Sequence, residues 1–221
     1  MTAEMRREIV RDAVGIGVAT GAYGLSFGAL SVAAGLDVAQ TSALSLLMFT
    51  GASQFALIGV LGAGGAWVAA AGSAILLGTR NALYGLRMAP LLDLSGGRRV
   101  AGSHLVIDES TAMGIAHEEG GHGALGFFAT GLSVFVFWNL GTVLGALGAR
   151  VIPSPESLGL DAAVPAAFIA LLAPRLRAGE PLAIAGLGAA VALALTPVLP
   201  IGVPIIASAL VAIVAGLRSR A

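Results

Sequence analysis

The chain has 221 residues, no cysteine and a formal net charge of zero, with 57% hydrophobic and 11% charged residues. Soluble domains carry about 25% charged residues, so these side chains are too few to cover a surface that faces water. Zero net charge argues against nucleic acid as a partner, and the lack of cysteine excludes disulfides, thiolate metal sites and thiol nucleophiles.

Long apolar runs dominate the sequence and predict an all-α, polytopic integral membrane protein. About 20 apolar residues cross a bilayer, and the mean hydropathy of the chain is +0.93. No stretch is polar enough for a separate soluble domain, so residues 1–221 are expected to form a single transmembrane domain of about seven helices. The predicted helices are Ala13–Ala34, Thr41–Leu61, Ala66–Leu92, Leu125–Leu147, Leu160–Leu172, Leu182–Thr196 and Ile201–Leu217.

Two polar segments lie outside these predicted spans. Residues 1–12 alternate acids with arginines and are predicted to form a short solvated helix in the cytoplasm. Residues 93–124 form a polar connecting region, in which His104, Asp108 and Thr111 are predicted to share a helical face. This region is expected to be a solvated connecting helix, a re-entrant element or an additional span. Arginine counts favour cytoplasmic N- and C-termini but leave the middle of the topology open.

Small residues four apart predict close packing between helices, because they let two backbones approach in lipid. The pairs are Gly17/Gly21, Gly24/Gly28 and Gly141/Gly145.

A short similarity between two parts of the chain suggests an internal repeat. Residues 27–30 read Phe-Gly-Ala-Leu and precede Gly35-Leu36-Asp37, while residues 144–147 read Leu-Gly-Ala-Leu and precede Gly159-Leu160-Asp161. Repeated halves are common in secondary transporters, which bind substrate between the repeats. The alternative is chance similarity in glycine- and alanine-rich sequence.

Polar side chains between residues 50 and 87 stand in sequence that is otherwise apolar enough for a bilayer. Gly51 is predicted to interrupt the second span just before Ser53 and Gln54. A helix broken at membrane depth exposes backbone groups, which is tolerated only against protein or a cavity. These residues are therefore expected either to contact a substrate at the break or to hydrogen-bond a neighbouring helix.

Arg80 and Asn81 follow in the next predicted span. Charges in hydrocarbon cost about 2.5–3.5 kcal/mol each and usually face a bundle interior or a wet pathway. Arginine keeps its proton in proteins, so Arg80 must meet an acid, for which Asp108 and Glu109 are the candidates, or a substrate carboxylate held by its planar fork. Arg87 is expected to pair with an acid or to snorkel to an interface.

Three acids near the predicted spans are candidates for proton coupling or ion pairing: Asp108, Glu109 and Asp161. Asp161 directly precedes a helical run, as Asp37 does, so a helix N-cap is the alternative for these two residues. Trp138 and Asn139 fall in the middle of Leu125–Leu147 and are predicted to face the interior of the bundle.

Sequence signatures of enzymes are absent. The chain has no lysine, no phosphate-binding loop, no Gly-x-Ser-x-Gly and no His-Glu-x-x-His. His117 and His122 have the wrong spacing for the zinc motif. We therefore expect no enzymatic activity, no cofactor and no metal site.

Six motifs occur in order along the chain: Gly24-Leu25-Ser26-Phe27-Gly28, Phe49-Thr50-Gly51-Ala52-Ser53-Gln54-Phe55, Arg80-Asn81-Ala82-Leu83-Tyr84-Gly85, Asp108-Glu109-Ser110, Trp138-Asn139-Leu140-Gly141-Thr142 and Pro165-Ala166-Ala167-Phe168. In this order they resemble the AzlC family, the large subunit of the branched-chain amino-acid exporter. The resemblance covers nearly the whole chain. It implies a multi-pass protein of the cytoplasmic (inner) cell membrane and a small AzlD-type membrane protein as its partner.

Residues and resemblance together predict a secondary-type permease subunit that exports branched-chain or related hydrophobic amino acids, coupled to protons. Arg80 or the start of the broken helix would hold the substrate carboxylate. The alternative is a non-transporting subunit that stabilises a partner permease, in which case the polar mid-span residues would mark a protein interface. The predicted substrate-binding residues are Gly51, Ser53, Gln54, Arg80, Asn81, Trp138 and Asn139.

Overall fold

The computed structural model describes residues 2–149, 169, 172–173, 176 and 179–218. These residues form helices and loops without a strand, which confirms the all-α fold. Almost all of the predicted helix Leu160–Leu172 lies outside the described residues, and so does Asp161. The helices are α1 (Ala3–Ala33), α2 (Val38–Leu47), α3 (Gly51–Gly62), α4 (Trp67–Leu92), α5 (Gly96–His104), α6 (Asp108–Ala116), α7 (Gly123–Gly148), α9 (Gly179–Leu195) and α10 (Val203–Arg218).

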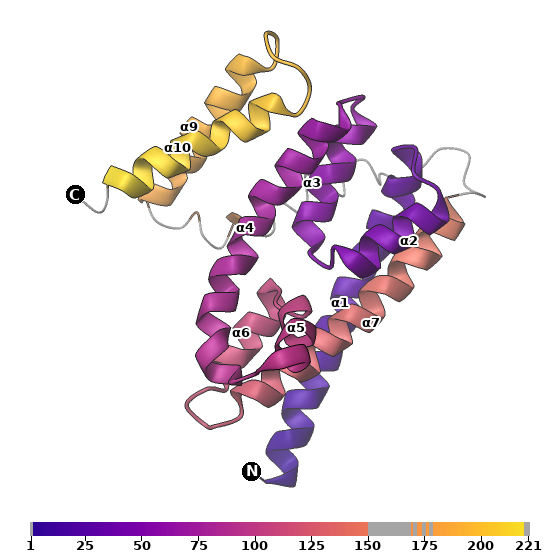
Figure 1. The fold of residues 1–221 in the computed structure, drawn as a ribbon, viewed down its shortest axis with the longest axis vertical. Coiled ribbons are helices and arrows are strands. Elements are labelled where there is room, and N and C mark those ends of the chain that lie inside the picture. The colour runs from indigo at the N-terminus through magenta and orange to yellow at the C-terminus, as the bar shows by residue number, and fades with distance from the viewer. Residues whose placement is uncertain (1, 150–168, 170–171, 174–175, 177–178, 219–221) are drawn as a thin grey trace.

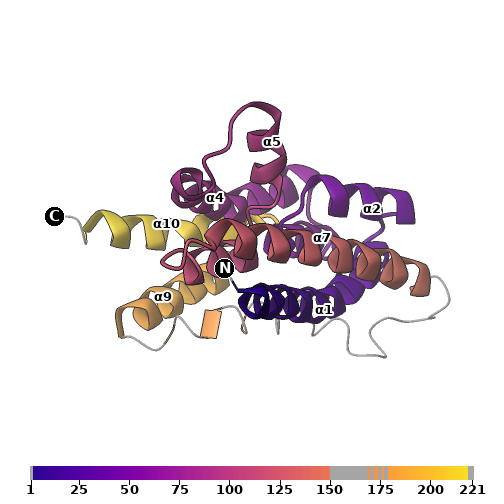
Figure 2. The same cartoon turned by 90° about the horizontal axis from the view of Figure 1, so that it is seen from below.

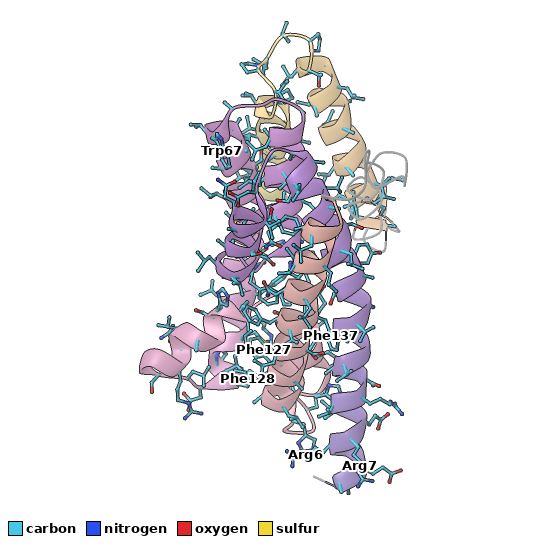
Figure 3. All side chains as sticks on the ribbon, turned by 90° about the vertical axis from the view of Figure 1, so that its right-hand side faces the viewer. Arg6, Arg7, Trp67, Phe127, Phe128 and Phe137 are labelled. Atoms are coloured by element: carbon cyan, nitrogen blue, oxygen red, sulfur yellow. The ribbon has the colours of Figure 1, made fainter. Side chains whose placement is uncertain are left out.

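α1 and α7 lie side by side along the long axis of the molecule (Figure 1, Figure 2). By length and composition, they are the two helices of the described chain that are apolar enough to cross a membrane. Gly21 of α1 faces the backbone of Phe137, and Gly28 faces that of Thr142, so the two helices run parallel. Figure 3 shows Phe137 where they meet.

The predicted glycine pairs form the contact between α1 and α7. A Cβ atom on Gly24 would lie 2.6 Å from the carbonyl oxygen of Trp138, which is closer than two such atoms can approach. A Cβ on Gly145 would collide with the carbonyl oxygen of Leu25. We call this contact the glycine seam; it consists of Gly17, Gly21, Gly24 and Gly28 of α1 with Gly141 and Gly145 of α7.

The N-terminal polar segment is helical, as predicted, but it is continuous with the apolar run in α1 and does not form a separate short helix. The side chain of Thr2 accepts a hydrogen bond from the Met5 N–H (3.3 Å) and caps the helix. Arginine and glutamate are good helix formers, and no glycine or proline separates them from the apolar run. The helix therefore continues unbroken from Ala3 to Ala33.

The predicted second span, Thr41–Leu61, is two helices rather than one. The chain is non-helical at 48–50, directly before Gly51, where the sequence predicts an interruption. α2 and α3 contain 10 and 12 residues, or about 15 and 18 Å, against about 30 Å for a hydrocarbon core. Figure 1 shows α3 doubling back toward the end from which α2 comes. Asp37 caps α2 in a capping box with Gln40, which confirms the N-cap alternative for that aspartate.

The polar region 93–124 contains the short helices α5 and α6, each of 9 residues, or about 14 Å. An additional span is therefore wrong, and His104 lies in a different helix from Asp108 and Thr111. The link 105–107 is apolar and buried, which agrees with the re-entrant alternative. The Ser110 hydroxyl holds this link, because it accepts from the Ile107 N–H (3.1 Å) and donates to the Leu105 carbonyl.

The two helical hairpins, α2–α3 and α5–α6, meet at their bends. His104 Nε2 at the end of α5 donates a hydrogen bond to the Leu46 carbonyl oxygen at the end of α2 (2.9 Å). The ring of Phe49, in the first link, lies 5.9 Å from the His104 ring. Figure 2 shows α5 on the opposite side of the molecule from α1.

α4 runs in the opposite direction to α1 and α7 (Figure 1). It has 26 residues, as many as α7, but contains the charged Arg80 and Arg87. Arg6 and Arg7 lie at one end of the molecule and Trp67, at the start of α4, lies toward the other (Figure 3). The end of α4 and the start of α5 therefore return toward the end that holds the N-terminus.

α9 and α10 correspond closely to the predicted helices Leu182–Thr196 and Ile201–Leu217. They pack mainly against each other, beside α4 (Figure 1). A Cβ on Gly72 of α4 would lie 3.0 Å from Ile206 Cδ1 of α10, which places the pair against the upper part of α4.

Candidate functional site

A cavity of about 200 Å³ lies where the two hairpin bends meet α1, α4 and α7. Pockets for drug-sized ligands have volumes of about 300–1,000 Å³, so this one suits a smaller solute. Its lining comes from five helices and both links: Thr20, Tyr23, Phe49, Thr50, Gly51, Ala52, Phe55, Arg80, Asn81, Ile107, Asp108, Glu109, Val134 and Trp138.

The start of α3 forms one side of the cavity through Thr50, Gly51 and Ala52. No side chain caps this helix. The N–H groups of a helical first turn have no partner within the helix, and the helix dipole adds partial positive charge there. This wall is therefore suited to an anionic group such as a carboxylate.

Arg80 and Asp108 form an ion pair in the cavity wall. Arg80 Nη2 lies 2.7 Å from Asp108 Oδ2, and the two side chains are 27% and 23% exposed. The Tyr84 hydroxyl donates to the other carboxylate oxygen, Asp108 Oδ1 (2.7 Å). Both oxygens of Asp108 are thus engaged by the protein, while Arg80 uses one nitrogen for this pair and keeps further donors.

Glu109 is the second carboxylate of the cavity, next to Asp108 in the first turn of α6. It is half-buried and forms no ion pair within the described residues. The N-terminal end of a helix stabilises negative charge, which explains how two adjacent acids are accommodated here.

Aromatic rings form the apolar part of the wall. Phe55 and Trp138 line the cavity, and the buried Phe27 packs behind them, with ring centroids 5.8 Å and 6.0 Å from its own. The Trp138 ring also covers Gly51, where a Cβ would lie 3.0 Å from Cη2. Glycine at this position therefore lets the indole close over the start of α3.

Six of the predicted site residues line this cavity. They are four predicted substrate contacts, Gly51, Arg80, Asn81 and Trp138, and two predicted acids, Asp108 and Glu109. The pairing of Arg80 with Asp108 is the one that the charge argument predicts. Arg87 pairs with Glu118 at the surface instead of entering the cavity.

Three predicted substrate contacts do not line the cavity. Ser53 and Gln54 are fully buried within the bundle, where Gln54 Nε2 donates to the Leu44 carbonyl oxygen (3.2 Å). Asn139 Nδ2 donates to the Phe135 carbonyl oxygen of its own helix (2.7 Å). Gln54 thus fits the alternative of a bond to a neighbouring helix, while Ser53 Oγ accepts from the Thr50 hydroxyl at the start of its own helix (3.4 Å). Asp161 lies outside the described residues.

Sequence reasoning missed the contributions of Thr20, Tyr23 and Phe49 to the lining. Thr20 and Tyr23 are polar residues three apart in the apolar α1, a spacing that places them on one helical face. Phe49 directly precedes the predicted interruption. These signals are present in the sequence but are weaker than a charge in an apolar segment.

A second hollow of about 420 Å³ adjoins the cavity. Phe49, Thr50 and Asn81 belong to the lining of both, so these three residues form the partition between them. No cluster of three histidine, aspartate or glutamate side chains within the described residues would hold a metal ion.

Residues 15–152 match the family model described as AzlC protein. No curated protein and no solved structure matches the chain. The matched range covers more than half of the 221 residues and contains every residue that lines the cavity. The chain is therefore an all-helical membrane protein that belongs to the AzlC family.

Proposed function

We propose that this chain is a permease subunit that exports branched-chain or related hydrophobic amino acids across the cytoplasmic membrane, and that the cavity is its substrate site. The association of the AzlC family with branched-chain amino-acid transport supports the substrate class. The cavity, at about 200 Å³, has room for a small solute such as one amino acid.

The composition of the cavity wall carries this proposal. Arg80 and the uncapped start of α3 suit a carboxylate. Glu109 supplies an acid, and Phe49, Phe55, Val134 and Trp138 supply an apolar surface. A hydrophobic α-amino acid has these same three parts: an anion, a cation and an apolar side chain.

Two features of the fold support alternating access coupled to protons. The site lies between two discontinuous elements, α2–α3 and α5–α6, an arrangement that secondary transporters use for substrate binding. Carboxylates inside membrane proteins also serve as proton carriers, and Asp108 and Glu109 both line the cavity. Protons moving inward would then drive the amino acid outward.

We propose a small AzlD-type membrane protein as the partner. The glycine seam is filled by contacts within this chain, so the partner would bind another face. The test is reconstitution into liposomes of this chain, of the partner, and of both, with efflux of labelled leucine, isoleucine and valine as the measurement and co-purification in mild detergent as the assembly assay.

The first prediction concerns a substitution that fills the cavity. Val134 is 3% exposed and lines the cavity, while Val136, two residues along the same helix, is 51% exposed on the outer face. Val134→Phe should abolish leucine efflux and Val136→Phe should leave it unchanged, at equal amounts of folded protein in the membrane. Equal efflux from both variants, or full efflux from the partner alone, would favour the structural-subunit alternative.

A further inference from the structure

Resting on the proposed function, we infer that Glu109 receives the ammonium group of the substrate, and that a proton competes with the substrate for this carboxylate. Glu109 would then let the site distinguish an amino acid from acids that have the same carbon skeleton but no ammonium group.

First, Asp108 is less suited than Glu109 to bind the ammonium group, because both of its oxygens already accept from protein donors. Its Oδ2 accepts from Arg80 (2.7 Å) and its Oδ1 from the Tyr84 hydroxyl (2.7 Å), so an ammonium would have to displace a protein donor. Glu109 forms no ion pair within the described residues, so an ammonium would displace no charged side chain from it. The neutral Asn81 is a weaker acceptor for a cation, since hydrogen bonds to charged groups are about twice as strong as neutral ones.

The second step is charge balance in the cavity. Arg80 and Asp108 cancel, which leaves the carboxylate of Glu109 as an unmatched negative charge beside an apolar wall. A substrate ammonium neutralises that charge, and the substrate carboxylate meets the remaining Arg80 donors and the start of α3. A neutral or purely anionic solute leaves Glu109 unmatched, so the site selects against it.

The third step is the competition with a proton. A protonated Glu109 cannot offer a charged acceptor to the ammonium, so each molecule of protein carries either the proton or the substrate at this position. The charged or titratable groups that face the cavity are Tyr23 from α1, Arg80 from α4 and Asp108 beside Glu109 on α6; α3 and α7 contribute none. Such exclusive binding is what exchange of inward protons for outward amino acid requires.

The test measures binding of leucine and of its α-keto acid to the purified protein, at neutral and at mildly acidic pH. The native protein should prefer leucine, and its affinity for leucine should fall at the lower pH as Glu109 becomes protonated. Glu109→Gln should weaken leucine binding by about ten- to a hundredfold, should leave the affinity for the keto acid unchanged or higher, and should remove the pH dependence. Glu118→Gln, which alters a surface carboxylate paired with Arg87, is the matched control.

Several results would overturn the inference. Equal binding of leucine and its keto acid by the native protein would reject the role of Glu109 and leave the proposed function standing. Native-like leucine binding by folded Glu109→Gln would do the same. A folded native protein that binds no amino acid would reject both. The comparison of ligands on the native protein decides the inference even if the variant does not fold.

Discussion

Arg80 and Asp108 neutralise each other's charge, and Arg80 cannot lose its charge because arginine keeps its proton in proteins. Breaking a fully buried pair costs about 3–5 kcal/mol, and we expect a smaller loss here because the side chains are 27% and 23% exposed. Arg80→Gln should lower the yield of folded protein, and adding Asp108→Asn should restore part of it.

The same variants separate the structural role of Arg80 from its proposed role in binding. If Arg80 also holds the substrate carboxylate, the double variant should regain yield without regaining leucine binding, and Arg80→Lys should rescue binding poorly because an ammonium lacks the planar fork. Yield and leucine binding are measured side by side. Undiminished binding by Arg80→Gln would remove Arg80 from the site, and Arg87→Gln serves as the surface control.

Some contacts of individual residues could be predicted from the sequence and others could not. Arg80 could be matched to a nearby acid because its charge demands a partner. The directions of Ser53, Gln54 and Asn139 could not be predicted, since their helices are apolar on every face and no periodic pattern tells a cavity from a neighbouring helix. The hydrogen bond from Gln54 to the Leu44 carbonyl forms only once α2 and α3 are packed, whereas Asn139 bonds the Phe135 carbonyl of its own helix.

The contact between α1 and α7 gives a prediction at the scale of the element. A Cβ on Gly145 would collide with the backbone of Leu25, whereas a Cβ on the half-buried Gly148, one turn further along α7, would meet nothing within 4 Å among the described residues. Overpacking a tight contact costs about 1–3 kcal/mol, while alanine in place of a helical glycine with room for a methyl group gains up to about 1 kcal/mol. Gly145→Ala should therefore lower the midpoint of thermal unfolding in detergent, and Gly148→Ala should keep or raise it. Similar midpoints for the two variants would contradict close packing of α1 against α7 at the glycine seam.

The two hairpins differ in how far they could be predicted from sequence. Gly51 and its polar neighbours interrupt an apolar run, so the break before α3 was predictable. The link between α5 and α6 is made of Leu105, Val106 and Ile107, which carry no turn signal, and the bend depends on the buried Ser110 hydroxyl and the contact of His104 with Leu46. The contact of His104 with Leu46 connects residues 58 apart in the chain and leaves no local pattern.

At the scale of the whole molecule, the hairpins resolve the conflict that arginine counting leaves open. If Thr41–Leu61 crossed the membrane, a cytoplasmic N-terminus would place Arg98 and Arg99 outside, against the positive-inside rule. Because α2 and α3 double back, the long helices before α5 are α1 and the antiparallel α4. We expect these two to be the crossings, which would return both arginines to the side of Arg6 and Arg7. The architecture and the charge distribution then agree.

This topology can be tested directly because the chain contains no cysteine. Single cysteines at the exposed positions Thr2, Ala63 and Ser95 would report the side of each loop to a membrane-impermeant maleimide in right-side-out and inverted vesicles. Thr2 and Ser95 should react from the cytoplasmic side and Ala63 from the outside, because α1 and α4 cross and the α2–α3 hairpin does not. A continuous second span predicts the reverse for both loops, with Ala63 inside and Ser95 outside. The cysteine-free parent should remain unlabelled, and reaction of Ala63→Cys from the cytoplasmic side would show that the hairpin does not return to the face from which it enters.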